Sequence, residues 1–192
     1  MILVIWFLGV YLIAGIPFGV IVSQLVAGKD VRAQGSGNIG ATNVARMMGK
    51  KWGILVLILD ALKGFLLVYL AGSLFEFNLV ANWAACVAVL AHCYPVYLKF
   101  KGGKGVATAL GVIAALSPTI LGICFLVFAA TLVLYRRVSA ASLLAALALP
   151  VGAYLVPHRI YPFTGFFICA VIWWKHRENI QRIIKGIEPR FF

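Results

Sequence analysis

The sequence predicts an all-α fold: a polytopic membrane helix bundle of seven transmembrane helices that forms a single integral membrane domain over residues 1–192. Hydrophobic residues make up 64% of the 192 residues, charged residues make up 11%, and the mean hydropathy is +1.03. A soluble domain is closer to half apolar and a quarter charged, so a soluble globule, a disordered chain and a small disulfide scaffold are excluded. The apolar runs are continuous rather than alternating, which favours helices over the strands of a transmembrane β-barrel.

Six apolar runs follow one another along the chain. They cover residues 2–26, 53–75, 79–98, 106–135, 140–156 and 161–174. The first run has no basic segment before it and no small-residue cleavage site after it, so we expect a first span rather than a signal peptide. The fourth run, at roughly 30 residues, is too long for one comfortable span, and Ser117-Pro118 interrupts it.

The distribution of Lys and Arg decides whether the fourth run is one kinked helix or two short helices with a turn at Ser117-Pro118. With seven spans, 15 of the 17 Lys and Arg residues fall on one side, in segments 28–52, 99–105, 135–139 and 175–192. Only Arg159 lies on the other side, and Lys63 lies within a span. Six spans would put Arg136, Arg137 and the basic C-terminal segment outside, against the positive-inside rule. We therefore expect seven spans, with the N-terminus outside and the C-terminus in the cytoplasm.

The net charge of +12 would suggest a nucleic-acid partner in a soluble protein, but in a membrane protein much of it is cytoplasmic-side bias. We expect no nucleic acid. The four cysteines lie within apolar runs without metal spacing, and the five acidic residues are scattered, so no metal ion and no cofactor are expected. The sequence also lacks a Gly-x-Ser-x-Gly elbow and the His-x4-Asp signature of common glycerolipid acyltransferases.

The four basic segments are rich in glycine, small hydroxyl and amide side chains, and cations, a combination that suits phosphate. The first segment contributes the candidate binding residues Ser36, Gly37, Asn38, Thr42, Asn43 and Arg46. We expect Thr42 or Asn43 to cap a helix that Gly49 ends. A loop followed by a plain interfacial helix is the alternative.

The second segment, Gly102-Gly103-Lys104-Gly105, leads directly into a helix that begins at residue 106. Helix N-termini attract anions, so we expect Lys104 and this loop to hold a phosphate. A Walker A motif is excluded because Leu98 stands where its first glycine would be. A flexible basic turn is the alternative.

The third and fourth segments add a few polar candidates. We expect Ser139 to be an N-cap, while Ser142 either satisfies its own helix or contacts a ligand. His176 and Asn179 are three residues apart, near the apolar stripe of an amphipathic segment, and we take both as site residues. In the second span Asp60 and Lys63 are also three apart, and we expect them to pair with each other; a relay role is the alternative.

Three of these stretches, SGNIGATNVAR (36–46), GGKGVAT (102–108) and HRENI (176–180), strongly resemble the three cytoplasmic motifs of the bacterial acyl-phosphate:glycerol-3-phosphate acyltransferases. The resemblance covers essentially the whole chain. It implies a multi-pass enzyme of the bacterial cytoplasmic (inner) membrane whose active site faces the cytoplasm. It also implies transfer of a fatty acyl group from acyl phosphate to the sn-1 hydroxyl of glycerol 3-phosphate, which gives lysophosphatidic acid and phosphate. Membrane lipid and the enzyme that makes acyl phosphate are the further partners implied.

From the residues and the resemblance together we expect the hydroxyl of glycerol 3-phosphate to attack acyl phosphate directly, without a covalent enzyme intermediate. Lys104, His176 and Asn179 are the catalytic candidates. The binding candidates are Ser36, Gly37, Asn38, Thr42, Asn43, Arg46, Gly102, Gly103 and Ser142, with the Gly102 and Gly103 amides expected to hold the acyl-phosphate head. The hydroxyl proton goes to His176 or to a substrate phosphate, whose second pKa is about 6. A membrane transporter of a phosphorylated metabolite is the alternative function.

Overall fold

The structure, a computed structural model, describes residues 1–75, 78–156 and 160–191, and among these residues it contains helices and loops but no strand. The helices are α1 (Ile2–Ala14), α2 (Phe18–Ala27), α3 (Ala41–Met48), α4 (Lys50–Phe75), α5 (Asn78–Cys93), α6 (Val106–Leu116), α7 (Pro118–Tyr135), α8 (Val138–Leu155), α9 (Pro162–Lys175) and α10 (Arg177–Ile184). Two 3₁₀ turns, η1 (Val31–Ala33) and η2 (Val96–Leu98), lie in the loops. The all-α prediction is confirmed for the described chain.

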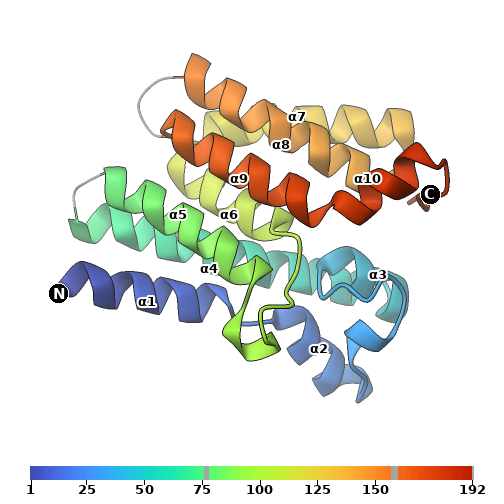
Figure 1. Cartoon of the computed structure of the whole chain (residues 1–192). Coiled ribbons are helices and arrows are strands. Elements are labelled where there is room, and N and C mark those ends of the chain that lie inside the picture. The colour runs from blue at the N-terminus through green and yellow to red at the C-terminus, as the bar shows by residue number, and fades with distance from the viewer. Residues whose placement is uncertain (76–77, 157–159, 192) are drawn as a thin grey trace.

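The long helices run back and forth along a common direction (Figure 1). The beginnings of α4, α6 and α8 lie at the same end of the bundle as the ends of α5, α7 and α9, and α3 and α10 lie at that end too. The N-terminus of α1 is at the opposite end. This arrangement gathers the four basic segments at one end of the molecule. That end is called the motif end below.

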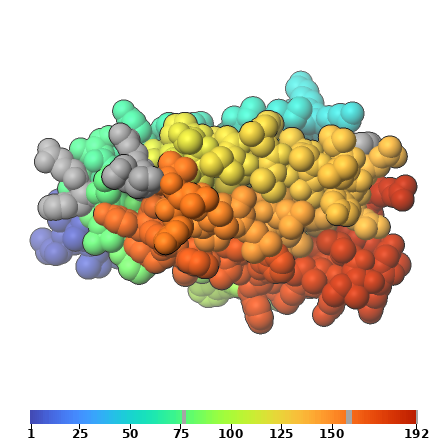
Figure 2. Space-filling model, turned by 90° about the horizontal axis from the view of Figure 1, so that it is seen from above, coloured from blue at the N-terminus to red at the C-terminus, as the bar shows by residue number. Residues whose placement is uncertain are grey.

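Length and hydropathy make this chain a multi-pass membrane protein. Within the described part of the chain, five stretches are long and apolar enough to cross a membrane: Ile2–Ala27, Lys50–Phe75, Asn78–Leu98, Pro118–Tyr135 and Val138–Leu155. Val106–Leu116 and Pro162–Lys175 are shorter apolar helices. Figure 2 shows α7 and α8 side by side on one face, where Phe125, Leu126 and Val133 are largely exposed. Such apolar side chains are suited to contact with lipid chains.

The predicted break in the fourth apolar run is confirmed. Helix α6 ends at Leu116 and α7 begins at Pro118, and the Ser117 hydroxyl accepts a hydrogen bond from the Ile120 N–H at 3.4 Å. Proline is favoured in the first turn of a helix because its missing N–H has no intrahelical partner there. Arg159, which we placed alone on the opposite side, lies outside the described residues.

The first apolar run, predicted as a single span, consists of two helices. Helix α1 ends at Ala14 and α2 begins at Phe18, so Gly15, Ile16 and Pro17 interrupt it. Proline lacks the N–H that would continue the helical ladder. The carbonyl of Ile16 instead accepts a hydrogen bond of 2.8 Å from Nζ of Lys63 in α4.

Helices α4 and α6 pack closely because small residues line their contact. A Cβ added to Gly111 of α6 would overlap the carbonyl of Ala61, and one added to Gly64 of α4 would lie 2.7 Å from the carbonyl oxygen of Thr108. Small residues at such crossings let two backbones approach each other in a membrane. The contact fixes the start of α6, and therefore the Lys104 loop, against α4.

Candidate functional site

Lys104 and Asn179, which come from two of the predicted motifs, are in direct contact at the motif end. Nζ of Lys104, in the loop before α6, donates a hydrogen bond of 2.6 Å to Oδ1 of Asn179 in α10. Nδ2 of Asn179 in turn donates a bond of 2.6 Å to Oε1 of Glu188, beyond the end of α10. Asn179 and Glu188 are both buried, so this chain of bonds holds the lysine in a defined position.

Glu188 joins the basic segments 135–139 and 175–192 directly, reaches Lys104 through Asn179, and was not among the predicted site residues. Its Oε1 also accepts a bond of 2.7 Å from the Ser139 hydroxyl of α8, and its Oε2 accepts one of 2.7 Å from Nε of Arg182. Nε of Arg137 donates to its backbone carbonyl at 3.2 Å. Burial raises the pKa of Glu188, but the bonds from Ser139, Asn179 and Arg182 outweigh that effect and hold the pKa below its ordinary value. The carboxylate is therefore charged at neutral pH.

The ammonium of Lys104 titrates near neutrality. Burial and the positive charge of Arg182 lower the pKa of Lys104 to about 8, with a smaller contribution from Arg46, while Glu188 and Glu178 act in the opposite direction. A half-buried lysine that retains its charge at neutral pH is an incompletely neutralised cation. It is suited to bind an anion, and an anion at this place would stabilise its charge.

His176 is a neutral, oriented imidazole beside this lysine. It is buried at the junction of α9 and α10, and its Nδ1 lies 2.8 Å from the carbonyl oxygen of Ile172. Since a carbonyl only accepts, the proton is on Nδ1 and the lone pair is on Nε2. Burial and the charge of Lys104 lower the pKa of His176 to about 4. The ring can therefore accept a hydrogen bond through Nε2 at neutral pH.

The glycine loop does not offer the two amides that the sequence reasoning assigned to a phosphate. The N–H of Gly102 donates to the carbonyl of Cys93 at 3.2 Å, and the N–H of Gly103 donates to the carbonyl of His92 at 3.1 Å. These bonds use both amides to attach the loop to the end of α5. A helix N-terminus has further unsatisfied N–H groups, so the first turn of α6, from Val106, is the better candidate for backbone contact with an anion.

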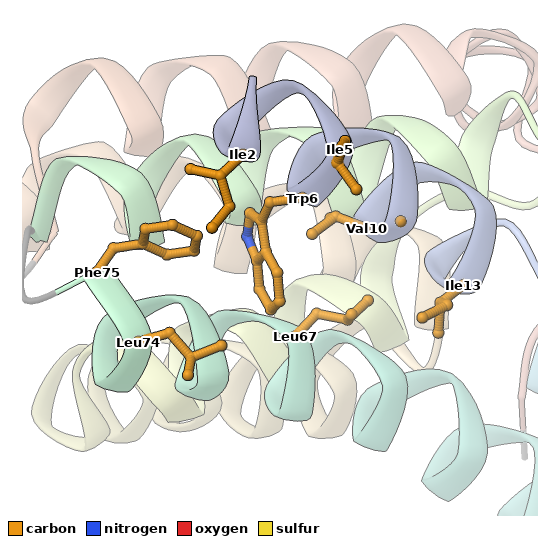
Figure 3. A pocket seen from close by; sticks show the side chains of 9 residues that line it. Ile2, Ile5, Trp6, Val10, Ile13, Leu67, Leu74 and Phe75 are labelled. Carbon is orange, nitrogen blue, oxygen red and sulfur yellow. The ribbon is translucent and has the colours of Figure 1, made fainter.

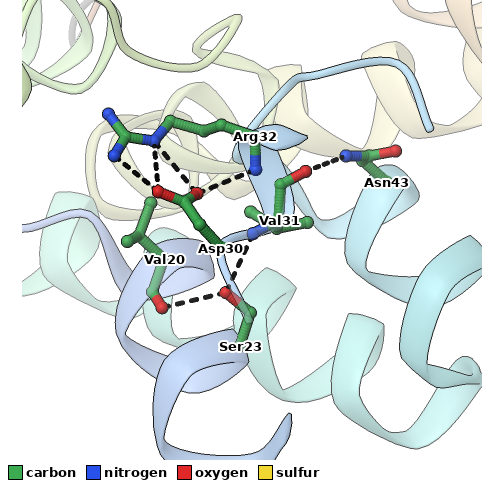
Figure 4. A network of polar contacts seen from close by, with 6 residues as sticks. All are labelled: Val20, Ser23, Asp30, Val31, Arg32 and Asn43. Atoms are coloured by element: carbon green, nitrogen blue, oxygen red, sulfur yellow. Dashed lines mark hydrogen bonds and ion pairs between the residues drawn. The ribbon is translucent and has the colours of Figure 1, made fainter. Parts of the chain in front are cut away.

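Asn43 organises the first motif instead of capping its helix. Its Oδ1 accepts the N–H of Ser36 at 2.9 Å. Its Nδ2 lies within 3.1 Å of the carbonyl oxygens of Val31, Gln34 and Asn38; the bond to Val31 is drawn in Figure 4. The buried amide thus holds the loop that carries Ser36 and Asn38.

The helix caps predicted for Thr42 or Asn43 and for Ser139 are wrong. Gly40 is the N-cap of α3 and makes no side-chain cap bond, because the Asn43 amide serves the loop. Gly49 ends α3 as predicted. Arg137 is the N-cap of α8, and the Ser139 hydroxyl donates to Glu188 instead.

Of the other predicted binding residues, Arg46 acts on Lys104 through its positive charge. Ser142 is buried and donates its hydroxyl to the carbonyl of Val138 at 2.9 Å, which satisfies its own helix. Ser36, Gly37 and Arg46 are exposed, and Thr42 is half-buried.

A lipid-facing groove of about 340 Å³ between α1 and α4 is separate from this site (Figure 3). It is lined by apolar side chains, among them Ile5, Trp6, Val10 and Leu67. The groove lies toward the N-terminal end of α1, away from the motif end. It has none of the cations that a phosphorylated substrate would require.

The fold and the site define a multi-pass membrane protein that gathers a lysine, a histidine and an asparagine at one end of its helices. A profile of the family described as glycerol-3-phosphate acyltransferase matches residues 4–186. The glycerol-3-phosphate acyltransferase of Syntrophotalea carbinolica is 47% identical over 186 residues, which cover 96% of this chain and 95% of the relative. That of Aquifex aeolicus is 43% identical over 183 residues, covering 94% and 95%.

Solved structures agree with these relatives. The crystal structure of PlsY (YgiH), an integral membrane glycerol 3-phosphate acyltransferase, in its glycerol 3-phosphate form has a TM-score of 0.94 at 40% identity and covers 100% of this chain and 96% of that chain. The lysophosphatidic acid form has a TM-score of 0.90 at 39% identity. This chain belongs to the glycerol-3-phosphate acyltransferase family and is an acyltransferase of phospholipid synthesis. The resemblance drawn from the three motifs is confirmed.

Proposed function

We propose that this protein transfers a fatty acyl group from acyl phosphate to the sn-1 hydroxyl of glycerol 3-phosphate, giving lysophosphatidic acid and inorganic phosphate. The observation that carries the proposal is the contact of the half-buried Lys104 ammonium with Asn179, close to the neutral imidazole of His176, at one end of an apolar bundle. Both substrates bear a phosphate that needs a cation. The acyl chain needs the apolar surface that the adjoining helices provide.

The donor is proposed to be acyl phosphate because its phosphate gives the half-buried Lys104 ammonium an anion to bind and its acyl group arrives already activated. Acyl phosphate is already activated, so positioning and charge stabilisation are sufficient for the hydroxyl to attack its carbonyl carbon directly. The new ester C–O bond forms as the C–O bond to phosphate breaks.

We assign the head of acyl phosphate to Lys104 and the first turn of α6. Glycerol 3-phosphate is assigned to Ser36 and Arg46 together with His176 and Asn179. Asn38, Thr42 and Ser142 line the space, while Gly37 and Asn43 shape the first motif and Gly102 and Gly103 shape the second. As the acyl carbonyl is attacked, negative charge passes to the leaving phosphate, where the Lys104 ammonium stabilises it.

The hydroxyl proton is proposed to go to an oxygen of a substrate phosphate. In the free protein the pKa of His176 is about 4, which makes it a weaker base than a phosphate with a second pKa of about 6. Nε2 of His176 then accepts a hydrogen bond from the sn-2 hydroxyl of glycerol 3-phosphate, which turns the sn-1 oxygen toward the acyl carbon while the sn-1 O–H faces an oxygen of the acyl phosphate that is later released. The proton leaves on the released phosphate, so the enzyme returns to its starting state.

The topology proposed with this function has seven spans, an outside N-terminus and a cytoplasmic C-terminus in the bacterial inner membrane. Its support is the alternating direction of the helices and the gathering of basic residues at the motif end. A cytoplasmic site would meet soluble glycerol 3-phosphate. It would also receive the donor from the enzyme that makes acyl phosphate.

The experiment uses purified protein in detergent with acyl phosphate and glycerol 3-phosphate. We expect lysophosphatidic acid and phosphate in equal amounts without any gradient, and loss of both products in Lys104→Ala. No product with wild-type protein, combined with uptake of glycerol 3-phosphate into protein-containing vesicles, would overturn the proposal in favour of a transporter.

A further inference from the structure

A buried polar cluster within the helices has no part in the mechanism described so far. Nζ of Lys63 lies 2.7 Å from Oδ1 of Asp60, one turn earlier in α4, and 3.2 Å from Nδ1 of His92 near the end of α5. Oδ1 of Asp60 is 3.6 Å from the same ring nitrogen. All three side chains are almost completely buried. Ionisable groups inside a membrane protein are costly, so their presence requires a reason.

Lys63 fixes the orientation of the His92 ring. An ammonium has three N–H donors and no acceptor. The Lys63 ammonium has three acceptors around it: the Asp60 carboxylate, the Ile16 carbonyl at 2.8 Å and Nδ1 of His92. Nδ1 of His92 faces both the Lys63 ammonium and the Asp60 carboxylate, so the Nε2 edge points away from this pair. The ring is therefore held in one orientation.

The other edge of the His92 ring lies against the glycine loop. A Cβ on Gly103 would overlap Nε2 of His92 and would lie 2.9 Å from its Cε1. The backbone of the same residue accepts the N–H of Gly103 at 3.1 Å. Gly103 immediately precedes Lys104, so the place of this ring determines where the loop can run.

We propose that Asp60, Lys63 and His92 form a positioning unit that sets the Gly102–Gly103 loop and thereby places the Lys104 ammonium in the site. None of the three touches substrate. The inference rests on the proposed function, because it assigns Lys104 the task of holding a substrate phosphate. It explains why the loop has no side chain where it passes the imidazole, and why a charged cluster is retained inside the bundle.

The test is a double-mutant cycle of Gly103→Ala and His92→Ala. Gly103→Ala forces the loop away from the ring, and we expect kcat/KM to fall by about 100-fold. His92→Ala alone loses about tenfold because the loop is less restrained. In the double variant the added methyl group occupies the space that the imidazole vacates. We expect kcat/KM of the double variant to exceed that of Gly103→Ala alone by about tenfold, a coupling of a size common for residues in contact.

Gly102→Ala is the matched control for this cycle. A Cβ there would overlap the backbone carbonyl of His92 and Pro95 Cδ rather than the ring, so His92→Ala should not rescue it. The inference would be overturned if the fold losses in kcat/KM of Gly103→Ala and His92→Ala simply multiplied in the double variant. It would also be overturned if His92→Ala rescued Gly102→Ala and Gly103→Ala equally. The melting temperatures of the same proteins measure the Gly103–His92 coupling independently of catalytic activity. Coupled stability without acyl transfer by wild-type protein would mean that the proposed function is wrong while the contact stands.

Lys63→Met tests the link from the ion pair to the loop. We expect the KM for acyl phosphate, the substrate assigned to Lys104, to rise about tenfold while kcat falls less, because the ammonium of Lys104 is present but misplaced. Asn82→Ala is the control: Asn82 is equally buried in α5 and holds α9 through the Tyr161 N–H and the Thr164 hydroxyl. It should lower the melting temperature with both KM values unchanged. Unchanged KM in Lys63→Met would contradict the positioning role.

Discussion

Nζ of Lys104 lies 2.6 Å from Oδ1 of Asn179, although 75 residues separate them in the sequence. The bond joins the glycine loop before α6 to the last amphipathic helix, α10, and it places a lysine whose pKa is about 8 beside a neutral histidine. The proposed activity depends on this meeting of two motifs at one end of the bundle.

Lys104→Ala should reduce kcat/KM by about 100-fold or more, because a preorganised cation at a developing phosphate charge contributes at least that much. The pKa near 8 adds a pH signature. The ammonium is present below that pKa and is lost above it, so kcat/KM should fall as the pH rises through about 8.

Lys104→Arg is the variant that separates this titration from other alkaline effects. A guanidinium stays charged, so the variant should be slower than wild type but should lack the alkaline fall. Initial rates with an enzyme-free blank for donor hydrolysis measure both profiles. An identical alkaline fall in the arginine variant would exclude Lys104 as the titrating group.

His176→Gln tests where the hydroxyl proton goes. Glutamine can accept a hydrogen bond but cannot take a proton. If a substrate phosphate is the base, as we propose, the variant should keep a measurable rate, reduced by about tenfold to 100-fold, whereas His176→Ala should lose more. The rate of acyl transfer at saturating substrates is the measurement. A loss as complete in His176→Gln as in His176→Ala would instead assign the proton to the imidazole.

Glu188→Gln should destabilise the motif end. It removes the charge that Arg182 pairs with at 2.7 Å and weakens the support of Asn179, at a cost of about 1–3 kcal/mol. The native pKa of Glu188 lies below its ordinary value. Its contribution to stability is therefore complete above the ordinary pKa and is lost as the pH falls through the lowered one.

Unfolding temperatures from neutral pH down to about pH 3 measure this contribution. The difference in unfolding temperature between wild type and Glu188→Gln should become smaller as the pH falls. Glu178→Gln is the control, because Glu178 is exposed on the neighbouring helix α10 and the variant should match wild type in melting temperature at neutral pH. A gap that stays constant with pH would show that the carboxylate charge is not the cause.

Asn43→Ala should disorder the first motif while leaving the transmembrane helices intact. The side chain holds the Ser36 N–H and reaches three backbone carbonyls from a buried position, so its loss leaves several buried groups unsatisfied. We expect faster proteolysis within residues 28–49 and a higher KM for glycerol 3-phosphate. Limited proteolysis followed by mass spectrometry measures the first effect. Proteolysis at the wild-type rate would contradict the role of Asn43.

Much of the fold was predictable because lipid imposes simple constraints. Long apolar runs placed the helices, and Ser117-Pro118 marked the break between α6 and α7 because proline begins a helix more readily than it continues one. The pairing of Asp60 with Lys63 followed from their spacing. The break of the first run at Gly15–Pro17 was not predicted, although Pro17 was the available signal because proline cannot continue the helical ladder.

The site was predictable where motifs carry its chemistry and unpredictable where tertiary contacts decide. Lys104 and Asn179 do meet, whereas Glu188 was missed because its partners lie in α8 and α10 and no local pattern connects them. An acidic residue in a strongly basic segment was the available signal. The amides of Gly102 and Gly103 were misassigned because their carbonyl partners in α5 become neighbours only after folding.

The central claim is acyl transfer from acyl phosphate at this lysine-centred site, and donor choice tests it most directly. Purified protein is given glycerol 3-phosphate with either acyl phosphate or acyl-CoA, and lysophosphatidic acid and inorganic phosphate are measured together. We expect equal amounts of both products from acyl phosphate and no product from acyl-CoA. Lysophosphatidic acid formed from acyl-CoA alone, or formed from acyl phosphate equally well by Lys104→Ala, would contradict that claim.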